Sequence, residues 1–169
     1  MELSLYERVK IHAMESDFSR LSLDGQEVVY MGQSITAPSR WDKKLLRHSF
    51  ALYGLIKREV LQIRFHLESN QVIESKIFKG RYKSVSDYKS IMNTMLELES
   101  LSRKYGLKIL KAEIAHTHLS ECRIDKKNLK FCMLSESDLQ VAKRLKQFRN
   151  YPIEIKAIAK DGLVFKKVF

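Results

Sequence analysis

The clearest pattern along the chain is an alternation of apolar and polar residues over positions 60–67, where Leu61, Ile63 and Phe65 are separated by polar side chains. Successive side chains of an extended chain point to opposite faces, so this alternation predicts a half-buried strand. The tripeptide at 68–70 indicates a turn, and residues 72–78 a second strand. Together they predict a β-hairpin that ends at Gly80.

Three other segments repeat their apolar residues every three to four positions, which predicts helices. The first runs from residue 41 to about 56. The second has Ser86 as its N-cap, extends through Tyr105 and ends before Gly106, and the third begins at Ser135. The residues expected to face inward are Tyr88, Ile91, Met92, Met95, Leu96 and Leu98 in the second helix, and Leu139, Ala142, Leu145 and Phe148 in the third.

The remaining strands are predicted at 107–116, 153–159 and 163–168, the last two joined by a hairpin at Asp161–Gly162. The order of elements is helix, strand, strand, helix, strand, helix, strand, strand. Helices that alternate with strands in this way predict an α/β fold, with a mixed β-sheet flanked by helices in a single domain. That domain is expected to span residues 34–169, and residues 1–33 form an N-terminal extension to which no role is assigned.

Composition adds a strong positive charge, with a net charge of +11 and a pI of 9.6 for 169 residues. An excess of Lys and Arg attracts polyanions, so nucleic acid is a secondary partner hypothesis. The charges are scattered, without a dense basic arm, and a solvated surface explains them equally well. No segment has the length of a membrane span, which favours a cytoplasmic protein without membrane contact. Cys122 and Cys132 are expected to be free thiols.

The most informative residues are His116 and His118, at the end of a predicted strand, and Asp138, at the start of the following helix. Residues i and i+2 of a strand point to the same side, so both imidazoles can face one point. Two imidazoles and a carboxylate leave a fourth position open, as in a catalytic zinc site. Each feature also has a simpler explanation, since histidines are common in surface loops and Ser135 with Asp138 forms a capping box.

The pattern Glu…His-x-His…Ser-x-x-Asp resembles the signature of the JAMM (MPN-plus) zinc metalloproteases, and the chain is most similar to their RadC-like branch. The further landmarks are Ile35-Thr36-Ala37-Pro38, Glu59 before a strand, the turn at 68–73, Phe78-Lys79-Gly80 and the His-Thr-His strand end. The resemblance covers residues 34–169 and implies the cytidine-deaminase-like architecture of that family.

The resemblance implies that His116, His118 and Asp138 bind Zn²⁺. It also implies that Glu59 takes a proton from the zinc-bound water and delivers one to the leaving amine, and that Ser135 steadies the oxyanion. Glu68 and Glu74 are rival carboxylates at the far end of the hairpin, and Asp125 is an alternative ligand. Two departures from the family are Leu119-Ser120-Glu121 in place of Pro-Ser-Gly and a longer segment between His118 and Asp138.

Three functions follow as hypotheses. The leading one is a zinc-dependent peptidase or isopeptidase, a JAMM-type deubiquitinase-like hydrolase whose substrate is a peptide or protein tail, with ubiquitin-like tails among the candidates. The second is a RadC-like, DNA-associated accessory protein without demonstrated catalysis. The third is a degenerate domain that only binds a protein partner.

Overall fold

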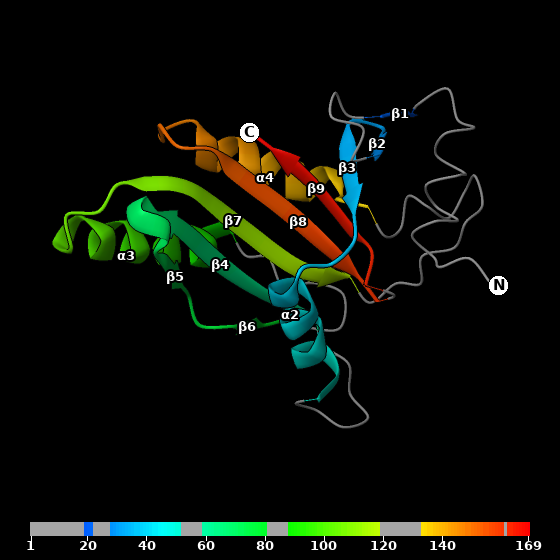
Figure 1. Ribbon diagram of the computed structural model, residues 1–169, viewed down its shortest axis with the longest axis horizontal. Coiled ribbons are helices and arrows are strands. Elements are labelled where there is room, and N and C mark those ends of the chain that lie inside the picture. The colour runs from blue at the N-terminus through cyan, green and yellow to red at the C-terminus, as the bar shows by residue number, and fades with distance from the viewer. Residues whose placement is uncertain (1–18, 22–27, 52–58, 81–87, 119–132, 161) are drawn as a thin grey trace.

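A mixed β-sheet runs through the whole computed structural model, which describes residues 19–21, 28–51, 59–80, 88–118, 133–160 and 162–169 (Figure 1). Eight strands lie in the order β1-β2-β3-β9-β8-β7-β4-β5, and β6 also pairs with β4. The strands are β1 (Ser19–Leu21), β2 (Val28–Tyr30), β3 (Gln33–Thr36), β4 (Val60–Leu67), β5 (Val72–Glu74), β6 (Phe78–Lys79), β7 (Ile109–His118), β8 (Ile153–Ala159) and β9 (Val164–Val168). The helices are α2 (Arg40–Ala51), α3 (Tyr88–Lys104) and α4 (Glu136–Lys146), with a short 3-10 turn, η1, at Glu68–Asn70.

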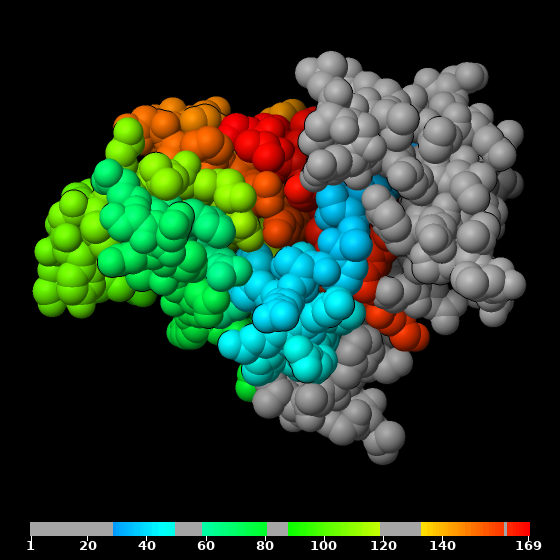
Figure 2. All heavy atoms as spheres, viewed as in Figure 1, coloured from blue at the N-terminus to red at the C-terminus, as the bar shows by residue number. Residues whose placement is uncertain are grey.

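Strand β7 determines the mixed character of the sheet. It pairs antiparallel with β4 and parallel with β8. Parallel neighbours need a crossover connection, and the segment between β7 and β8 contains α4, which packs on β8. Strand β9 returns antiparallel to β8 and then pairs with β3, so early and late segments of the chain lie side by side (Figure 2).

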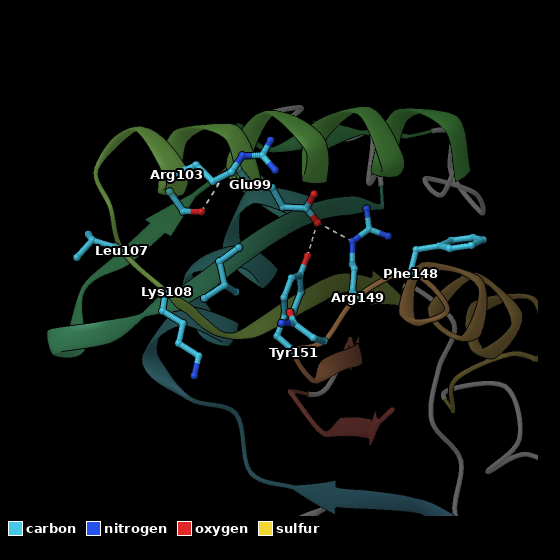
Figure 3. A pocket seen from close by; sticks show the side chains of 10 residues that line it. Glu99, Arg103, Leu107, Lys108, Phe148, Arg149 and Tyr151 are labelled. Atoms are coloured by element: carbon cyan, nitrogen blue, oxygen red, sulfur yellow. Dashed lines mark hydrogen bonds and ion pairs between the residues drawn. The ribbon is translucent and has the colours of Figure 1, made fainter.

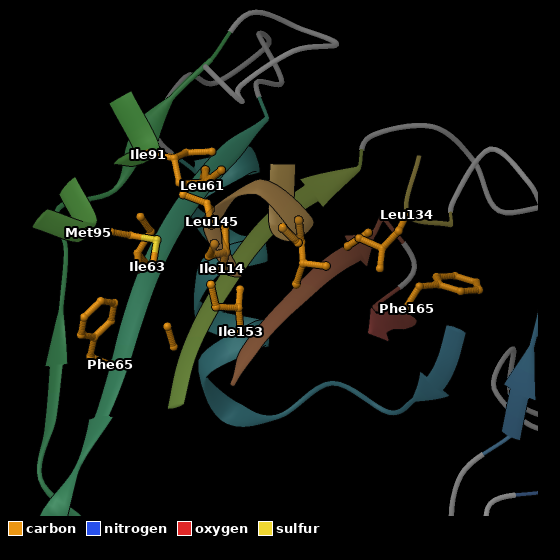
Figure 4. Close-up of a cluster of buried hydrophobic side chains, with 14 of the residues drawn as sticks. Leu61, Ile63, Phe65, Ile91, Met95, Ile114, Leu134, Leu145, Ile153 and Phe165 are labelled. Carbon is orange, nitrogen blue, oxygen red and sulfur yellow. The ribbon is translucent and has the colours of Figure 1, made fainter. Parts of the chain in front are cut away.

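The helices cover the two faces of the sheet unequally. On one face, α3 and α4 pack over a large apolar core that includes Phe65, Met95, Ile114, Leu145 and Ile153 (Figure 4). On the other face, α2 covers a smaller cluster: Trp41, Leu45, Val60, Ala115, Ile158 and Val164. Side chains that leave β7 at even positions therefore enter the layer shared with α4, and those at odd positions face α2.

The predicted fold class is confirmed, because the chain forms one mixed sheet with three helices packed against it. The strand predicted at 60–67 is β4, and the second helix ends before Gly106, which adopts a positive φ of 65° as a C′ glycine does. The first helix is described as far as Ala51, and the expected continuation to residue 56, like the N-cap at Ser86, lies outside the described residues.

The strand predicted at 72–78 is interrupted, and Ser75 explains why. Its backbone N–H donates to the Ile63 carbonyl at 2.8 Å, while its hydroxyl accepts from the Ile63 N–H at 3.0 Å. A side-chain oxygen thus takes the place of a backbone carbonyl in the ladder. The segment consequently divides into β5 and β6, which pair with different parts of β4.

Two of the residues predicted to face inward are exposed instead. Leu96 is 49% exposed, because Ile91, Met95 and Leu98 form the buried side of α3 and Leu96 points away from it. Phe148 is 85% exposed, because α4 ends at Lys146 and helical periodicity no longer applies beyond that residue. Both predictions were wrong because the apolar spacing was extended beyond the buried face of each helix. Leu96 lies on the exposed side of α3, and Phe148 follows the end of α4.

The N-terminal part of the chain contributes strands to the same sheet. Strand β2 pairs antiparallel with both β1 and β3, and Tyr30 is buried in the main core. These strands lie on both sides of the expected boundary between residues 33 and 34, which stays a prediction. Cys122, Cys132 and Asp125 lie outside the described residues.

Candidate metal centre

The two histidines leave the end of β7 on the face that α4 covers. His116 is 3% exposed, and its Nε2 lies 2.7 Å from Nε2 of His118. The two rings meet edge to face, with centroids 4.5 Å apart. The structure therefore brings together the two imidazoles, as their i and i+2 positions on a strand predict.

The first turn of α4 places Asp138 against this pair. Its Oδ2 lies 3.3 Å from Nε2 of His116 and 3.6 Å from Nε2 of His118. Ser135 is the N-cap of α4: its hydroxyl accepts from the Asp138 N–H at 3.2 Å, and its own N–H donates to Asp138 Oδ2 at 2.8 Å. Asp138 thus completes a capping box and also faces the histidines. A role as a helix cap and a role as a metal ligand are therefore compatible for this residue.

The three side chains form a group that could hold a metal ion, with one ligand atom from each lying within 4.8 Å of the others. Zinc bonds of 2.0–2.2 Å in a tetrahedron give about 3.3–3.6 Å between ligand atoms. The two histidine–aspartate distances, 3.3 and 3.6 Å, match that spacing, whereas the Nε2–Nε2 distance of 2.7 Å is shorter, so the two imidazoles would have to move apart to hold an ion. Two neutral imidazoles and one carboxylate also suit zinc chemically and leave one position for water or substrate.

The electrostatic environment of Asp138 favours its deprotonated form. Burial alone would raise the pKa of its carboxyl group, but His116 first, then hydrogen bonds from His118 and the Ser135 backbone, hold that pKa well below its ordinary value. A metal ligand must be deprotonated, and the lowered pKa keeps the Asp138 carboxyl group in that form. The two histidines must also be neutral before they can bind a metal ion.

Glu59 immediately precedes β4 and is nearly buried, with 9% of its surface exposed. Leu61 pairs with His116 in the antiparallel register, so the same register continued by two residues places Glu59 opposite His118. Opposed residues of an antiparallel pair have their side chains on the same face. Glu59 therefore belongs to the face that carries the histidines, whereas Glu68 and Glu74 lie at the other end of β4, in η1 and β5.

Thr117, between the two histidines, supports the site from the other face of the sheet, and sequence reasoning missed it. It is fully buried and faces α2, where its Oγ1 lies 2.6 Å from the Ser49 hydroxyl and accepts from the Val60 N–H at 3.0 Å. These contacts link the histidine segment to α2 and to the residue that follows Glu59. The available signal in the sequence was a hydroxyl side chain between the two histidines, at a strand position whose side chain points to the opposite face of the sheet.

A second feature missed from the sequence is a buried ionic cluster on the same face of the sheet as α2. Lys156 is 8% exposed, and its Nζ lies 3.2 Å from Glu113, 3.4 Å from Glu154 and 3.6 Å from Asp42. Lys111 also reaches Glu113, at 3.2 Å. The charged residues inside the predicted strand at 153–159 were the available signal, because a buried charge requires partners.

Comparisons with known proteins add no family to this geometry. The sequence matches no protein-family model, and no curated protein matches it either. Among the helices of the described segments, none combines the length and the apolar character that crossing a bilayer requires.

Proposed function

We propose that the protein is a zinc-dependent hydrolase of the JAMM type, close to the RadC-like branch, that cleaves a peptide or isopeptide bond in a peptide or protein tail. The observation that carries the proposal is the convergence of His116, His118 and Asp138, whose ligand atoms all lie within 4.8 Å of one another. A zinc ion held there would supply a water molecule with its pKa lowered to about 7 and would polarise the carbonyl of the substrate.

Glu59 is the proposed general base and acid. The β4–β7 register, continued from Leu61 by two residues, supports a position on the histidine face, and the residue is largely buried. There its carboxylate accepts the proton of the attacking water and passes it to the amine that leaves. Ser135, exposed at the start of α4, keeps its hydroxyl hydrogen free of the capping interaction, in which the oxygen is an acceptor. It donates this hydrogen to the oxyanion that develops on the substrate carbonyl.

Metal content tests the proposal without knowledge of the substrate. The wild-type protein, reconstituted with zinc and desalted, is expected to retain about one ion per chain. His116→Ala and Asp138→Ala should retain much less, whereas His48→Ala, a change of a histidine in α2, should match the wild type. Wild-type protein that retains no zinc, or His116→Ala that retains as much as wild type, would contradict the metal centre.

Hydrolysis is tested next, with fluorogenic peptides and lysine-linked ubiquitin conjugates as probes. Glu59→Gln should bind zinc like the wild type and lose hydrolysis by a factor of about 100 or more, as removal of a general base does. If Glu59→Gln cleaves the same probe at the wild-type rate, the carboxylate has no such role. Loss of zinc in this variant would instead make Glu59 part of the metal site.

A further inference from the structure

A pocket of about 510 Å³ lies outside the metal centre, and Figure 3 shows the side chains that line it. The end of α3, the start of β7 and the loop between α4 and β8 form it. Its lining includes Ile109, the first residue of β7, whereas His116 and His118 end that strand. At about 3.3 Å per residue, roughly 25 Å separates the pocket from the histidines. The pocket is therefore a second site, separate from the proposed reaction.

The wall of the pocket is a partly buried group of side chains that hydrogen bonds hold in place. Oε1 of Glu99 accepts from Nε of Arg149 at 2.6 Å and from the hydroxyl of Tyr151. Arg149 also donates to the Leu145 carbonyl at 2.7 Å. Lys146 donates to the carbonyls of Arg149 and Tyr151, at 3.1 and 3.2 Å. The loop after α4 is thereby held in place, and the charges of Glu99 and Arg149 offset each other.

Two further cations of the lining have no such partner. Arg103, in the last turn of α3, and Lys108, just before β7, are both exposed. Within the described segments, no carboxylate lies within ion-pair distance of either side chain. The Glu68 carboxylate accepts the Lys108 backbone N–H at 2.7 Å and offsets part of this charge. With the Glu99–Arg149 pair neutral, the lining itself still carries two cations, which favours an anionic ligand.

An exposed aromatic ring completes the site. Phe148 is 85% exposed, although a large apolar side chain gains free energy when it is buried. In Figure 3, Lys108 and Phe148 lie at opposite ends of the group, with Glu99, Arg149 and Tyr151 between them. A ligand that contacts all of these residues is therefore extended. It carries negative charge at the Lys108 end and presents a flat or apolar group to Phe148.

We propose that this pocket binds single-stranded nucleic acid, with phosphates at Arg103 and Lys108 and a base stacked on Phe148. Proteins that bind single strands combine these two elements: cations that follow the backbone and aromatic rings on which bases stack. The net charge of +11 favours a polyanion over a singly charged ligand. A double helix fits the site less well, because its bases are already stacked and cannot reach the ring.

The test measures the fluorescence anisotropy of a labelled 15-nucleotide oligodeoxythymidine and of the matching oligouridine with the full chain, over a range of NaCl concentrations. Phe148→Ala should weaken binding by about tenfold or more, with an unchanged salt dependence, because base stacking is uncharged. The double change Arg103→Gln and Lys108→Gln should lower the slope of log K against log salt by about 1.4, since each phosphate contact to a single strand contributes about 0.7.

Matched controls separate the pocket from general attraction to the positive surface. Leu96→Ala changes an exposed apolar residue of α3 that does not line the pocket, and it should leave the affinity unchanged. The double change Lys43→Gln and Lys44→Gln removes two exposed charges from α2, on the other face of the sheet, and should leave the slope nearly unchanged.

Three outcomes would overturn the proposal. The first is full affinity in Phe148→Ala, and the second is an equal loss of slope in the α2 variant. The third concerns competition: a 15-residue polyglutamate displaces the labelled strand at the same concentration as unlabelled oligodeoxythymidine does. That result would identify an acidic peptide site instead. If the DNA and RNA probes bind with different affinity, and both the Phe148→Ala effect and the loss of slope are observed, the tighter-binding probe represents the preferred ligand.

Discussion

The hydroxyl of Thr117 lies 2.6 Å from the hydroxyl of Ser49, on the face of the sheet opposite to the histidines that flank Thr117 in sequence. Both residues are fully buried. The same Thr117 oxygen accepts the N–H of Val60, the residue after Glu59. One side chain therefore fixes three parts of the site relative to one another: the histidine segment, α2 and the start of β4.

Replacement of this hydroxyl should affect hydrolysis more than metal binding. Thr117→Val keeps the shape of the side chain but leaves the Ser49 hydroxyl and the Val60 N–H without their partner, at a cost of about 1–3 kcal/mol per buried group. Since β4 begins at Val60, Glu59 should lose its fixed position, and kcat should fall while zinc content and KM stay near wild type. Thr117→Ser, which restores the hydroxyl, should recover kcat. Equal kcat in the Val and Ser variants at matched stability would show that the hydroxyl has no positioning role.

Replacement of Ser135 should affect both stability and hydrolysis, because Ser135 is the N-cap of α4 and the proposed donor to the oxyanion. Ser135→Ala removes the acceptor of the Asp138 N–H and should reduce the free energy of unfolding by about 1 kcal/mol, as loss of an N-cap does. The Ser135 backbone N–H still donates to Asp138, so zinc should remain bound. Thermal unfolding and zinc analysis check both points. Ser135→Asp is the informative comparison, because it keeps a cap but not a hydroxyl donor, and it should restore stability without restoring hydrolysis.

The sequence predicted local elements well because their determinants are local. Alternation at 60–67 and the capping box at the start of α4 depend on neighbouring residues, and both are present in the structure. The approach of Asp138 to His116 was predicted from family resemblance together with strand and helix geometry. The distances between these residues depend on how α4 packs over β8, which the sequence does not specify.

The contacts that the sequence did not indicate are those between segments far apart in the chain. Thr117 meets Ser49 across 68 positions, and Glu99 meets Arg149 across 50. Phe148 was predicted to lie in the core because it continues the apolar spacing of Leu139, Ala142 and Leu145. In the structure α4 ends at Lys146, and Phe148 is exposed. Pairwise contacts of this kind depend on sheet order and helix docking, which periodicity does not encode.

Lys156 should be essential to stability although its side chain lies on the face of the sheet opposite to the histidines. Lys156→Met would leave the carboxylates of Asp42, Glu113 and Glu154 without their shared cation, and loss of one partner from a buried ion pair costs about 3–5 kcal/mol. Unfolding by urea should show this loss. Lys43→Met, a change of an exposed lysine in α2, is the control and should stay within about 0.5 kcal/mol of wild type. A stability of Lys156→Met equal to that of the control would mean that the cluster contributes no net stability.

The same cluster predicts how stability changes with acid. Burial would raise the pKa of Glu113, but Lys156, Lys111 and His66 hold it below its ordinary value of 4.5. A carboxyl group whose pKa is lower in the folded state contributes stability above its unfolded pKa, and this contribution is lost as the pH falls through the folded value. Glu113→Gln should therefore differ most from wild type near neutral pH, and the two free energies of unfolding should converge below 4.5. Glu136→Gln, at an exposed position in the first turn of α4, is the matched control. A gap between wild type and Glu113→Gln that stays constant from neutral to acidic pH would show that packing, rather than charge, accounts for the contribution of Glu113.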